Sequence, residues 1–357
     1  MSEPEIQNSS DRNDVYKNNS QKLIYQNIGF TGNASEYFGI WIVNVILSIV
    51  TLGIYSAWAK VRRETYFKNN TKIADNNFGY HATGGQILKG RLIAFAVIVV
   101  FNILSTFLPM LGAAIIFILF FIIPWAINKS MKFSARMTSF RNIRFNWHGT
   151  YLGTFWFLVI APVLSILSLG LLLPLISKSY YSYFARSHSY GTSSFLCQPR
   201  ARDFYYAYLI GSILPTLFIG FLTFIFFIVV IKLTSIESFF SALFASLYVL
   251  GFSLIFIYPI MSRNLMINYL LIKDFAKFES NINPFRFVWI ALSNLLMVLF
   301  SFGLLLPLAQ IRMYKYLANC TKIKVHGDMD KFFDKENTTR SSFGEEFAEL
   351  EGIEVSI

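Results

Sequence analysis

The chain has 357 residues and a formal net charge of +11 at pH 7, with 55% hydrophobic, 18% aromatic and 14% charged residues. Ordinary soluble domains hold roughly 25% charged residues, so this composition excludes general disorder, argues against a single soluble domain and indicates a polytopic membrane protein. Two cysteines, Cys197 and Cys320, are too few for a disulfide framework of the secreted kind.

Composition divides the chain into three regions. Residues 1–26 form a predicted disordered polar tail without the apolar stretch of a signal peptide. Residues 27–326 form a predicted transmembrane repeat domain, and residues 327–357 a predicted acidic tail with nine acidic and three basic residues. No nucleic-acid-binding motif accompanies the basic excess of the body. We therefore interpret its Lys and Arg residues as topology determinants beside anionic lipid headgroups, and expect no nucleic-acid partner.

Seven segments are long and apolar enough, or nearly so, to cross a bilayer, which takes roughly 20 residues. They are 38–59, 91–108, 111–128, 153–176, 206–231, 239–260 and 286–311. Short connectors predict that 91–108 with 111–128, and 206–231 with 239–260, form two transmembrane hairpins. The predicted fold class is an all-α membrane protein, a polytopic helical bundle with these two hairpins and three repeat helices.

The three remaining segments share a pattern of residues. Each has a Gly after an apolar run, a small residue or Pro four positions later, and a Tyr thirteen positions later. These residues are Gly53, Ala57 and Tyr66; Gly170, Pro174 and Tyr183; and Gly303, Pro307 and Tyr316. A Phe also lies eleven residues before a Trp in each copy: Phe30, Phe145 and Phe278. Such internal repetition is common in transporter folds, and it is equally compatible with a packed bundle that transports nothing.

Basic residues flank both ends of the repeat helices 153–176 and 286–311, whereas a Lys/Arg excess marks the cytoplasmic side. Either these helices cross against that rule, or they break near Gly53, Gly170 and Gly303 and re-enter. Broken helices at membrane depth require protein or a watery cavity around the freed backbone groups, so re-entrant helices would line a shared cavity. Pro174 and Pro307 would assist the breaks, and the three glycines would serve as gating points. The C-terminus is predicted to be cytoplasmic.

Short β elements are predicted at the cytoplasmic face. Polar and apolar residues alternate in Arg141–Trp147, as in a strand. Thr71–Tyr80 and His188–Cys197 are similarly rich in turn residues. An interfacial aromatic belt would produce similar residues.

The candidate sites are few. The predicted hydrocarbon interiors hold no ionisable residue, which disfavours proton relays and ion-coupled carboxylate sites. Their notable polar residues are Asn44, Asn102 and Asn294, which we interpret as helix–helix contacts in preference to substrate ligands. Basic and aromatic residues after each Gly suit either an anionic lipid headgroup or simple anchoring by snorkelling side chains. They are Lys60, Arg62, Arg63, Tyr66, Lys178, Tyr183, Arg312, Lys315 and Tyr316.

No catalytic constellation is found in the sequence. The four histidines lack the paired spacing of metal ligands, and nucleotide-binding fingerprints are absent. We expect no catalytic residue, no metal site and no cofactor, which favours a protein that is not an enzyme.

The first repeat carries a more specific signature. It reads Phe30-Thr-Gly-Asn-Ala-Ser-Glu-Tyr-Phe38, then Thr51-Leu-Gly-Ile-Tyr-Ser-Ala-Trp-Ala59, followed by Phe78-Gly-Tyr80 and Thr83-Gly-Gly85. Over about residues 28–326 this resembles the YjgN-like family of bacterial multi-pass inner-membrane proteins. The resemblance implies a bacterial inner-membrane location; because the family's function is uncharacterised, it carries over no site residues. Ala57 stands where the family often has Pro.

Two function hypotheses follow. The first is a transporter-like, channel-like or lipid-handling protein with a cavity at the repeat interface, in contact with the bilayer and with anionic lipid. The alternative is a non-transporting membrane scaffold or regulator. It would bind a protein partner through its basic face and acidic tail, in which Phe343, Phe347 and Leu350 could share a helical face.

Overall fold

The computed structural model describes residues 24–107, 109–229, 236–273, 275–325 and 333–334. The predicted all-α bundle is wrong, because the described residues also form a closed antiparallel barrel, in the strand order β1-β10-β9-β8-β7-β6-β5-β4-β3-β2. The strands are β1 (Ile24–Phe30), β2 (Thr71–Ile73), β3 (Asn76–Tyr80), β4 (Thr138–Phe140), β5 (Ile143–Trp147), β6 (His188–Tyr190), β7 (Ser193–Cys197), β8 (Leu270–Ile272), β9 (Ala276–Ser280) and β10 (Thr321–Val325).

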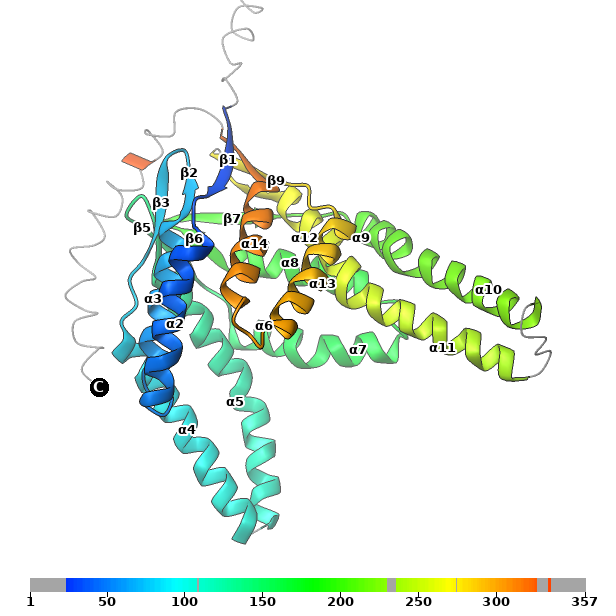
Figure 1. Cartoon of the computed structure of the whole chain (residues 1–357), viewed down its shortest axis with the longest axis horizontal. Helices are drawn as coiled ribbons and strands as arrows, with labels where there is room; N and C mark the ends of the chain where they lie inside the picture. Colours follow the sequence, from blue (N-terminus) through cyan, green and yellow to red (C-terminus); the bar gives the residue numbers. More distant parts are fainter. Residues whose placement is uncertain (1–23, 108, 230–235, 274, 326–332, 335–357) are drawn as a thin grey trace, which may run out of the picture.

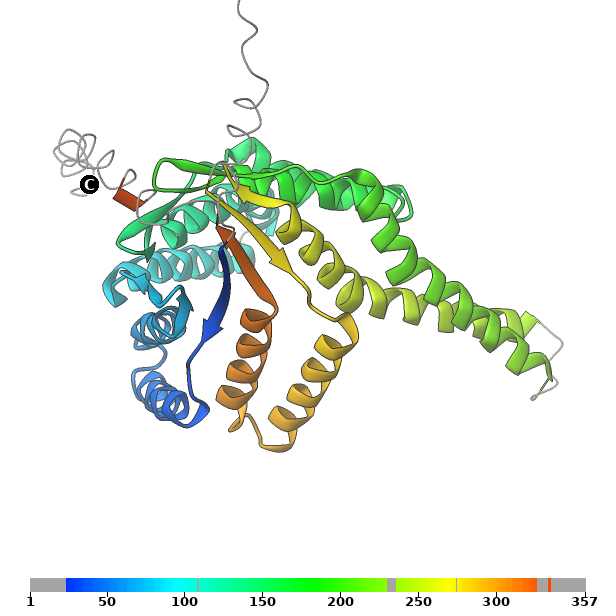
Figure 2. The ribbon, with the colours of Figure 1, turned by 90° about the horizontal axis from the view of Figure 1, so that it is seen from above.

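Helical hairpins are inserted between the strands, and they leave the barrel on one side and splay apart (Figures 1 and 2). Each hairpin starts after a longer strand and returns to a neighbouring strand. Their parts are α2 (Ala34–Val50) with α3 (Ser56–Asn69); α4 (Gly84–Phe107) with α5 (Pro109–Arg136); α6 (Tyr151–Phe155), the π-helix η1 (Trp156–Ile160) and α7 (Ala161–Leu167) with α8 (Leu173–Arg186); α9 (Ala201–Tyr208), η2 (Leu209–Ile213) and α10 (Leu214–Val229) with α11 (Ile236–Phe252), η3 (Ser253–Ile257) and α12 (Tyr258–Tyr269); and α13 (Pro284–Phe300) with α14 (Leu306–Asn319).

Tight turns at the other end of the barrel fix the register of the strands. Ala74 and Asp75 join β2 to β3 with φ of 47° and 62°, and Arg141 and Asn142 join β4 to β5 with φ of 45° and 65°. Two successive residues with positive φ give the turn whose twist suits a two-residue β-hairpin. Closing the barrel leaves no strand edge unpaired.

The alternation along the strands lines the inside of the barrel with apolar side chains. Each odd-numbered strand contributes one residue and each even-numbered strand another, giving two rings of five. The first ring is Ile28, Phe78, Phe145, Phe195 and Phe278, and the second is Ile73, Phe140, Tyr190, Ile272 and Ile323. Phe78, Phe145, Phe195 and Phe278 follow one another around the barrel with ring centroids 6.2–6.4 Å apart. The predicted β segments therefore form a core of their own.

The repeated glycines lie in three matching turns. Each of the predicted helices 38–59, 153–176 and 286–311 is two helices in the structure. The N–H groups of Gly53, Gly170 and Gly303 donate to the carbonyl five residues earlier, at 2.7–2.8 Å, and these glycines have φ of 83–90°. This 6→1 bond is the Schellman ending of an α-helix. Both ends of each pair consequently lie at the barrel.

Two prolines begin the returning helices. Pro174 and Pro307 are buried and lie in the first turn of α8 and α14, where a missing N–H leaves no helical hydrogen bond unmade. In the first hairpin this place is taken by Ala57, also fully buried. The chain therefore turns at the glycines, and the prolines start the next helix.

Among the described residues, three helical stretches are long and apolar enough to cross a membrane: 84–107, 201–226 and 240–269. The apolar helices at 34–50, 151–167 and 284–300 are shorter. Of the predicted tails, residues 1–23, 326–332 and 335–357 lie outside the described residues, including Phe343, Phe347 and Leu350.

Candidate functional site

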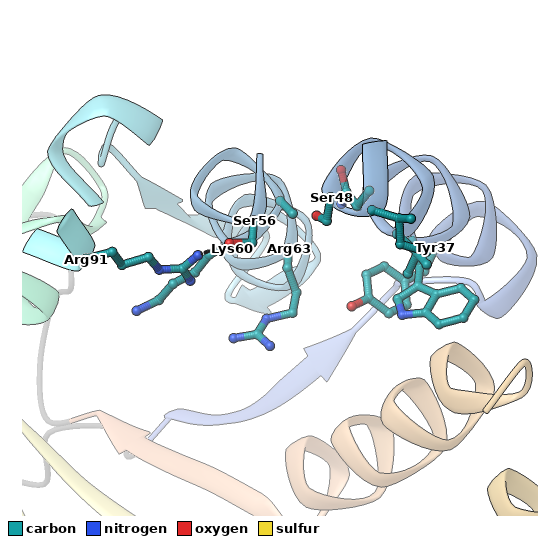
Figure 3. Close-up of a pocket in the computed structure, with 11 residues that line it drawn as sticks. Tyr37, Ser48, Ser56, Lys60, Arg63 and Arg91 are labelled. Atoms are coloured by element: carbon teal, nitrogen blue, oxygen red, sulfur yellow. Dashed lines mark hydrogen bonds between the residues drawn. The ribbon is translucent and has the colours of Figure 1, made fainter. Parts of the chain in front are cut away.

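A pocket of about 420 Å³ lies between α2, α3 and the start of α4 (Figure 3). Its lining is amphipathic: three cationic side chains stand beside a wall of apolar ones and three small polar groups. The lining residues are Tyr37, Trp41, Asn44, Val45, Ser48, Ile49, Ser56, Ala59, Lys60, Arg63 and Arg91. We call it the α2–α3 pocket.

The cations come from two elements. Lys60 and Arg63 are three residues apart on α3 and therefore share a helix face. Arg91 reaches from α4 and donates a hydrogen bond to the Ser56 hydroxyl. In Figure 3 the Lys60 side chain extends toward Arg91, whereas Arg63 extends from α3 in a different direction. Arg63 pairs with Glu64 at 3.0 Å, whereas Lys60 and Arg91 have no ion pair with a carboxylate of the described chain. The pocket therefore carries a net positive charge.

A second pocket, of about 490 Å³, lies between α3 and α14 and shares Arg63 with the first. It is lined by Arg63, Glu64, Phe67, Lys68, Ala309, Gln310, Met313, Tyr314 and Leu317. The Tyr37 hydroxyl donates to Oε1 of Gln310 at 2.8 Å and ties α2 to α14. Burial lowers the pKa of Lys68, whose ammonium lies 6.0 Å from the Phe78 ring centre at the barrel end of α3. The two pockets thus meet at Arg63, between the first and last hairpins of the chain.

The α2–α3 pocket contains a buried acceptor without a partner. Asn44 is 7% exposed, and its Oδ1 has no hydrogen-bond partner in the described structure. Asn294 occupies the matching position, nine residues before Gly303, but it is fully bonded. Its Nδ2 donates to the Ala309 carbonyl at 3.0 Å, and its Oδ1 accepts from Arg312 at 3.2 Å. Asn102 is exposed and donates to Ile98 O on its own helix.

The difference between the hairpins comes from one arginine. Arg62 stands nine residues after Gly53, as Arg312 stands nine after Gly303. Its guanidinium lies 5.6 Å from the centre of the Tyr55 ring instead of on Asn44. The polar face of the first hairpin is therefore left open, and that of the last is closed.

The repeated tyrosines hold the base of each hairpin together. The Tyr66 hydroxyl accepts from the Asn33 N–H at 2.8 Å and donates to the Asn33 carbonyl at 2.9 Å. Tyr316 makes the same pair of contacts with Asn283 at 3.2 Å, and Tyr183 donates to Thr150 O at 3.2 Å. These hydroxyls form hydrogen bonds with backbone groups where helices begin, and the three tyrosines line neither of the two pockets. Lys178 and Lys315 also line neither pocket.

Of the candidate lipid-contact residues, the structure thus brings only Lys60 and Arg63 into the α2–α3 pocket. Arg91 was absent from the predicted site. The sequence shows Arg91 as a basic residue at the start of the predicted span 91–108. Its approach to α3 depends on the barrel, because β2 and β3 return the chain beside the first hairpin. Within the described part of the chain, no group of three His, Cys, Asp or Glu residues could hold a metal ion.

Comparison with known proteins gives a family and no fold precedent. No solved structure matches this chain significantly. The inner membrane protein YjgN of Salmonella typhimurium is 33% identical over 149 residues, which cover 42% of this chain and 38% of that protein. YjgN of Escherichia coli K12 is 32% identical over 144 residues, 40% of this chain and 36% of that protein. The chain therefore matches less than two fifths of the length of these curated relatives. The model of the family described as bacterial protein of unknown function (DUF898) matches residues 26–350, so the chain belongs to that family.

Proposed function

We propose that this protein is a multi-pass protein of the bacterial inner membrane that binds anionic amphiphiles, acidic phospholipids above all, in the α2–α3 pocket. The observation that carries the proposal is the pocket's composition. Lys60, Arg63 and Arg91 provide cations for a phosphate, and Trp41, Val45 and Ile49 provide apolar surface for the adjoining chain. Basic groups beside the headgroup region attract anionic lipid by about 1 kcal/mol each.

The membrane location is supported by the relatives' names and by the surface of the hairpins. The tips of the three shorter hairpins expose large apolar side chains almost completely: Leu52 by 94%, Leu169 by 90% and Phe302 by 97%. Exposed apolar surface of this kind marks an interaction site or a membrane contact. Lys60 follows the first tip by only eight residues, so this hairpin would lie in the leaflet beside the barrel, with its charges among the headgroups.

This arrangement supports the re-entrant alternative. All five hairpins leave and return on one side of the barrel, so each basic segment lies at the same membrane face. By the positive-inside rule that face is the cytoplasmic one. In this proposal the longer hairpins cross the bilayer and return, the shorter ones dip into it, and the C-terminus is cytoplasmic.

The second pocket favours lipid handling at the repeat interface. It lies between the first and last repeated hairpins, and Arg63 lines both this pocket and the α2–α3 pocket. A gating role for Gly53, Gly170 and Gly303 remains a prediction. The scaffold alternative rests on the acidic tail, whose residues 335–357 lie outside the described structure.

The experiment is native mass spectrometry of the detergent-solubilised protein with phosphatidylglycerol or phosphatidylcholine. The triple variant Lys60→Gln, Arg63→Gln, Arg91→Gln should bind phosphatidylglycerol roughly a hundredfold more weakly, at about 1 kcal/mol per cation. The control variant Lys72→Gln, Lys277→Gln, Lys322→Gln removes the same charge from the barrel strands and should bind like the parent. Equal losses in both variants, or equal binding of both lipids to the parent, would refute a specific pocket.

A further inference from the structure

The inside of the barrel is a cavity of its own, separate from the two basic pockets. It measures about 250 Å³ and is lined by the two rings of five described above, together with Phe275, Ala276, Val325 and Phe333. We call it the lumen. Its lining is apolar; the one hydroxyl among these side chains, that of Tyr190, donates to the Phe140 carbonyl at 2.9 Å. All ten strands contribute to its wall.

Such a cavity is poorly suited to water and unusually large to stay vacant. A buried water needs two to four polar partners, and apolar cavities of about 150 Å³ stay dry and admit small apolar molecules. Close-packed interiors leave few voids larger than a water molecule. Size and chemistry together therefore point to an apolar occupant.

One mouth of the lumen is closed by a residue from beyond the last strand. Phe333 is 4% exposed and packs on Phe140, Phe275 and Tyr190 with ring centroids 5.6–6.2 Å apart. The Arg141 guanidinium lies 4.2 Å from the centre of the Phe333 ring and makes a cation–π contact with it. Arg141 lies in the turn between β4 and β5, and Phe275 lies between β8 and β9, so Phe333 packs at the end of the barrel away from the helices.

We propose that the lumen is a binding site for a single hydrocarbon chain, of the kind carried by a fatty acid or a lipid, and that Phe333 retains the chain at the turn end. The two rings of five side chains surround a space of about 250 Å³, which suits a single slender chain. The bilayer beside the helices is a reservoir of such chains. The lumen shares no lining residue with the α2–α3 pocket, so either proposal can be refuted without refuting the other.

The test is photolabelling of the detergent-solubilised full-length protein with decanoic acid that carries a diazirine on its chain, followed by peptide mapping. The expected result is labelling of β3, β5, β7 and β9, competed by unlabelled decanoic acid. Phe195→Trp and, independently, Ile272→Phe fill the lumen and should each reduce strand labelling several-fold. Phe333→Ala should speed exchange of the bound probe.

Phe300→Ala is the matched control, because it removes a phenyl ring from the exposed end of α13. It should leave strand labelling unchanged. Labelling confined to the helices in the parent and in Phe333→Ala would overturn the proposal. So would strand labelling that survives both Phe195→Trp and Ile272→Phe in folded protein.

Discussion

The guanidinium of Arg312 donates a hydrogen bond to Oδ1 of the buried Asn294, at 3.2 Å. A second bond, to Oγ of Ser293 at 2.9 Å, fixes its position along α13. The corresponding pair in the first hairpin, Arg62 and Asn44, is separated, since Arg62 lies over Tyr55. Two hairpins with the same turn thus differ in one side-chain placement, and only the first keeps an unpaired buried acceptor beside its pocket.

Arg312→Ala should therefore destabilise the protein more than Arg62→Ala. Loss of Arg312 leaves Asn294 Oδ1 buried without a donor, which costs about 1–3 kcal/mol. Loss of Arg62 removes an exposed cation–π contact worth about 0.5–1 kcal/mol. Thermal unfolding in detergent, followed by tryptophan fluorescence, measures the difference. Equal midpoints for the two variants would show that the Arg312–Asn294 bond contributes little.

The turn glycines permit a matched pair of substitutions. Gly53 has φ of +90° and no neighbour that a Cβ would meet, so Gly53→Ala tests backbone strain alone. We expect a loss of about 1–2 kcal/mol. Gly39→Ala, at an exposed position within α2 that is also free of close neighbours, should instead raise stability by up to about 1 kcal/mol. A midpoint that rises for Gly53→Ala as well as for Gly39→Ala would show that the positive φ at Gly53 causes little strain.

The same substitution should cost more at Gly170, in the hairpin of α7 and α8. A Cβ at Gly170 would approach the Tyr208 hydroxyl to 2.9 Å, adding steric contact to the unfavourable φ of +83°. Gly303, with φ of +89° and open space around it, should behave like Gly53. The expected order of unfolding midpoints is therefore Gly170→Ala below Gly53→Ala and Gly303→Ala, in the same fluorescence assay.

These turns show what local sequence could predict. The Gly offsets placed Gly53, Gly170 and Gly303 at equivalent sites because a Schellman turn depends on a few consecutive residues. The barrel was not predictable in this way. Its strands are three to seven residues long, and β1 pairs with β10 near the other end of the chain, as in Gln26 with Ile323. Closure depends on a register that no local pattern records.

The aligned phenylalanines illustrate the same limit. Phe145 and Phe278 do belong to one ring of the lumen, but Phe30 packs instead with Tyr37 and Tyr66 beneath the first hairpin. Ile28 takes its place in the ring. A shift of two residues along β1 keeps the same strand face and changes the neighbour, so spacing from a Trp was insufficient. The α2–α3 pocket shows the same limit of local patterns. Lys60 and Arg63 lie on one helix and could be paired from the sequence, whereas Arg91 approaches them only in the tertiary fold.

Membrane sidedness can be tested with single cysteines at Asn77, Ser194 and Lys277, all exposed on the barrel. In a background lacking Cys197 and Cys320, all three should resist an impermeant maleimide in intact cells and react after permeabilisation. The reason is that every hairpin returns to the same face. Crossing repeat helices would instead place Ser194 and Lys277 opposite Asn77. Labelling that separates Asn77 from the other two would thus exclude the re-entrant arrangement.

Cys197 and Cys320 should differ in thiol reactivity. Burial raises the pKa of the Cys197 thiol in β7 to about 11, and Cys197 has no exposed surface, whereas Cys320 is half-buried. Because the thiolate is the reactive form, Cys320 should be alkylated first at pH 8, with Cys197 modified only on unfolding.

The raised folded-state pKa of the Cys197 thiol also means that this thiol ionises at lower pH in the unfolded chain than in the folded protein. Its contribution to stability is therefore complete below about pH 9 and is lost as the pH rises toward 11. Mass-spectrometric timing of alkylation in each single-cysteine variant measures the difference in reactivity, and the unfolding midpoint between pH 8 and pH 11 measures the change in stability. Rapid alkylation of Cys197 in native protein would show that β7 opens from the barrel.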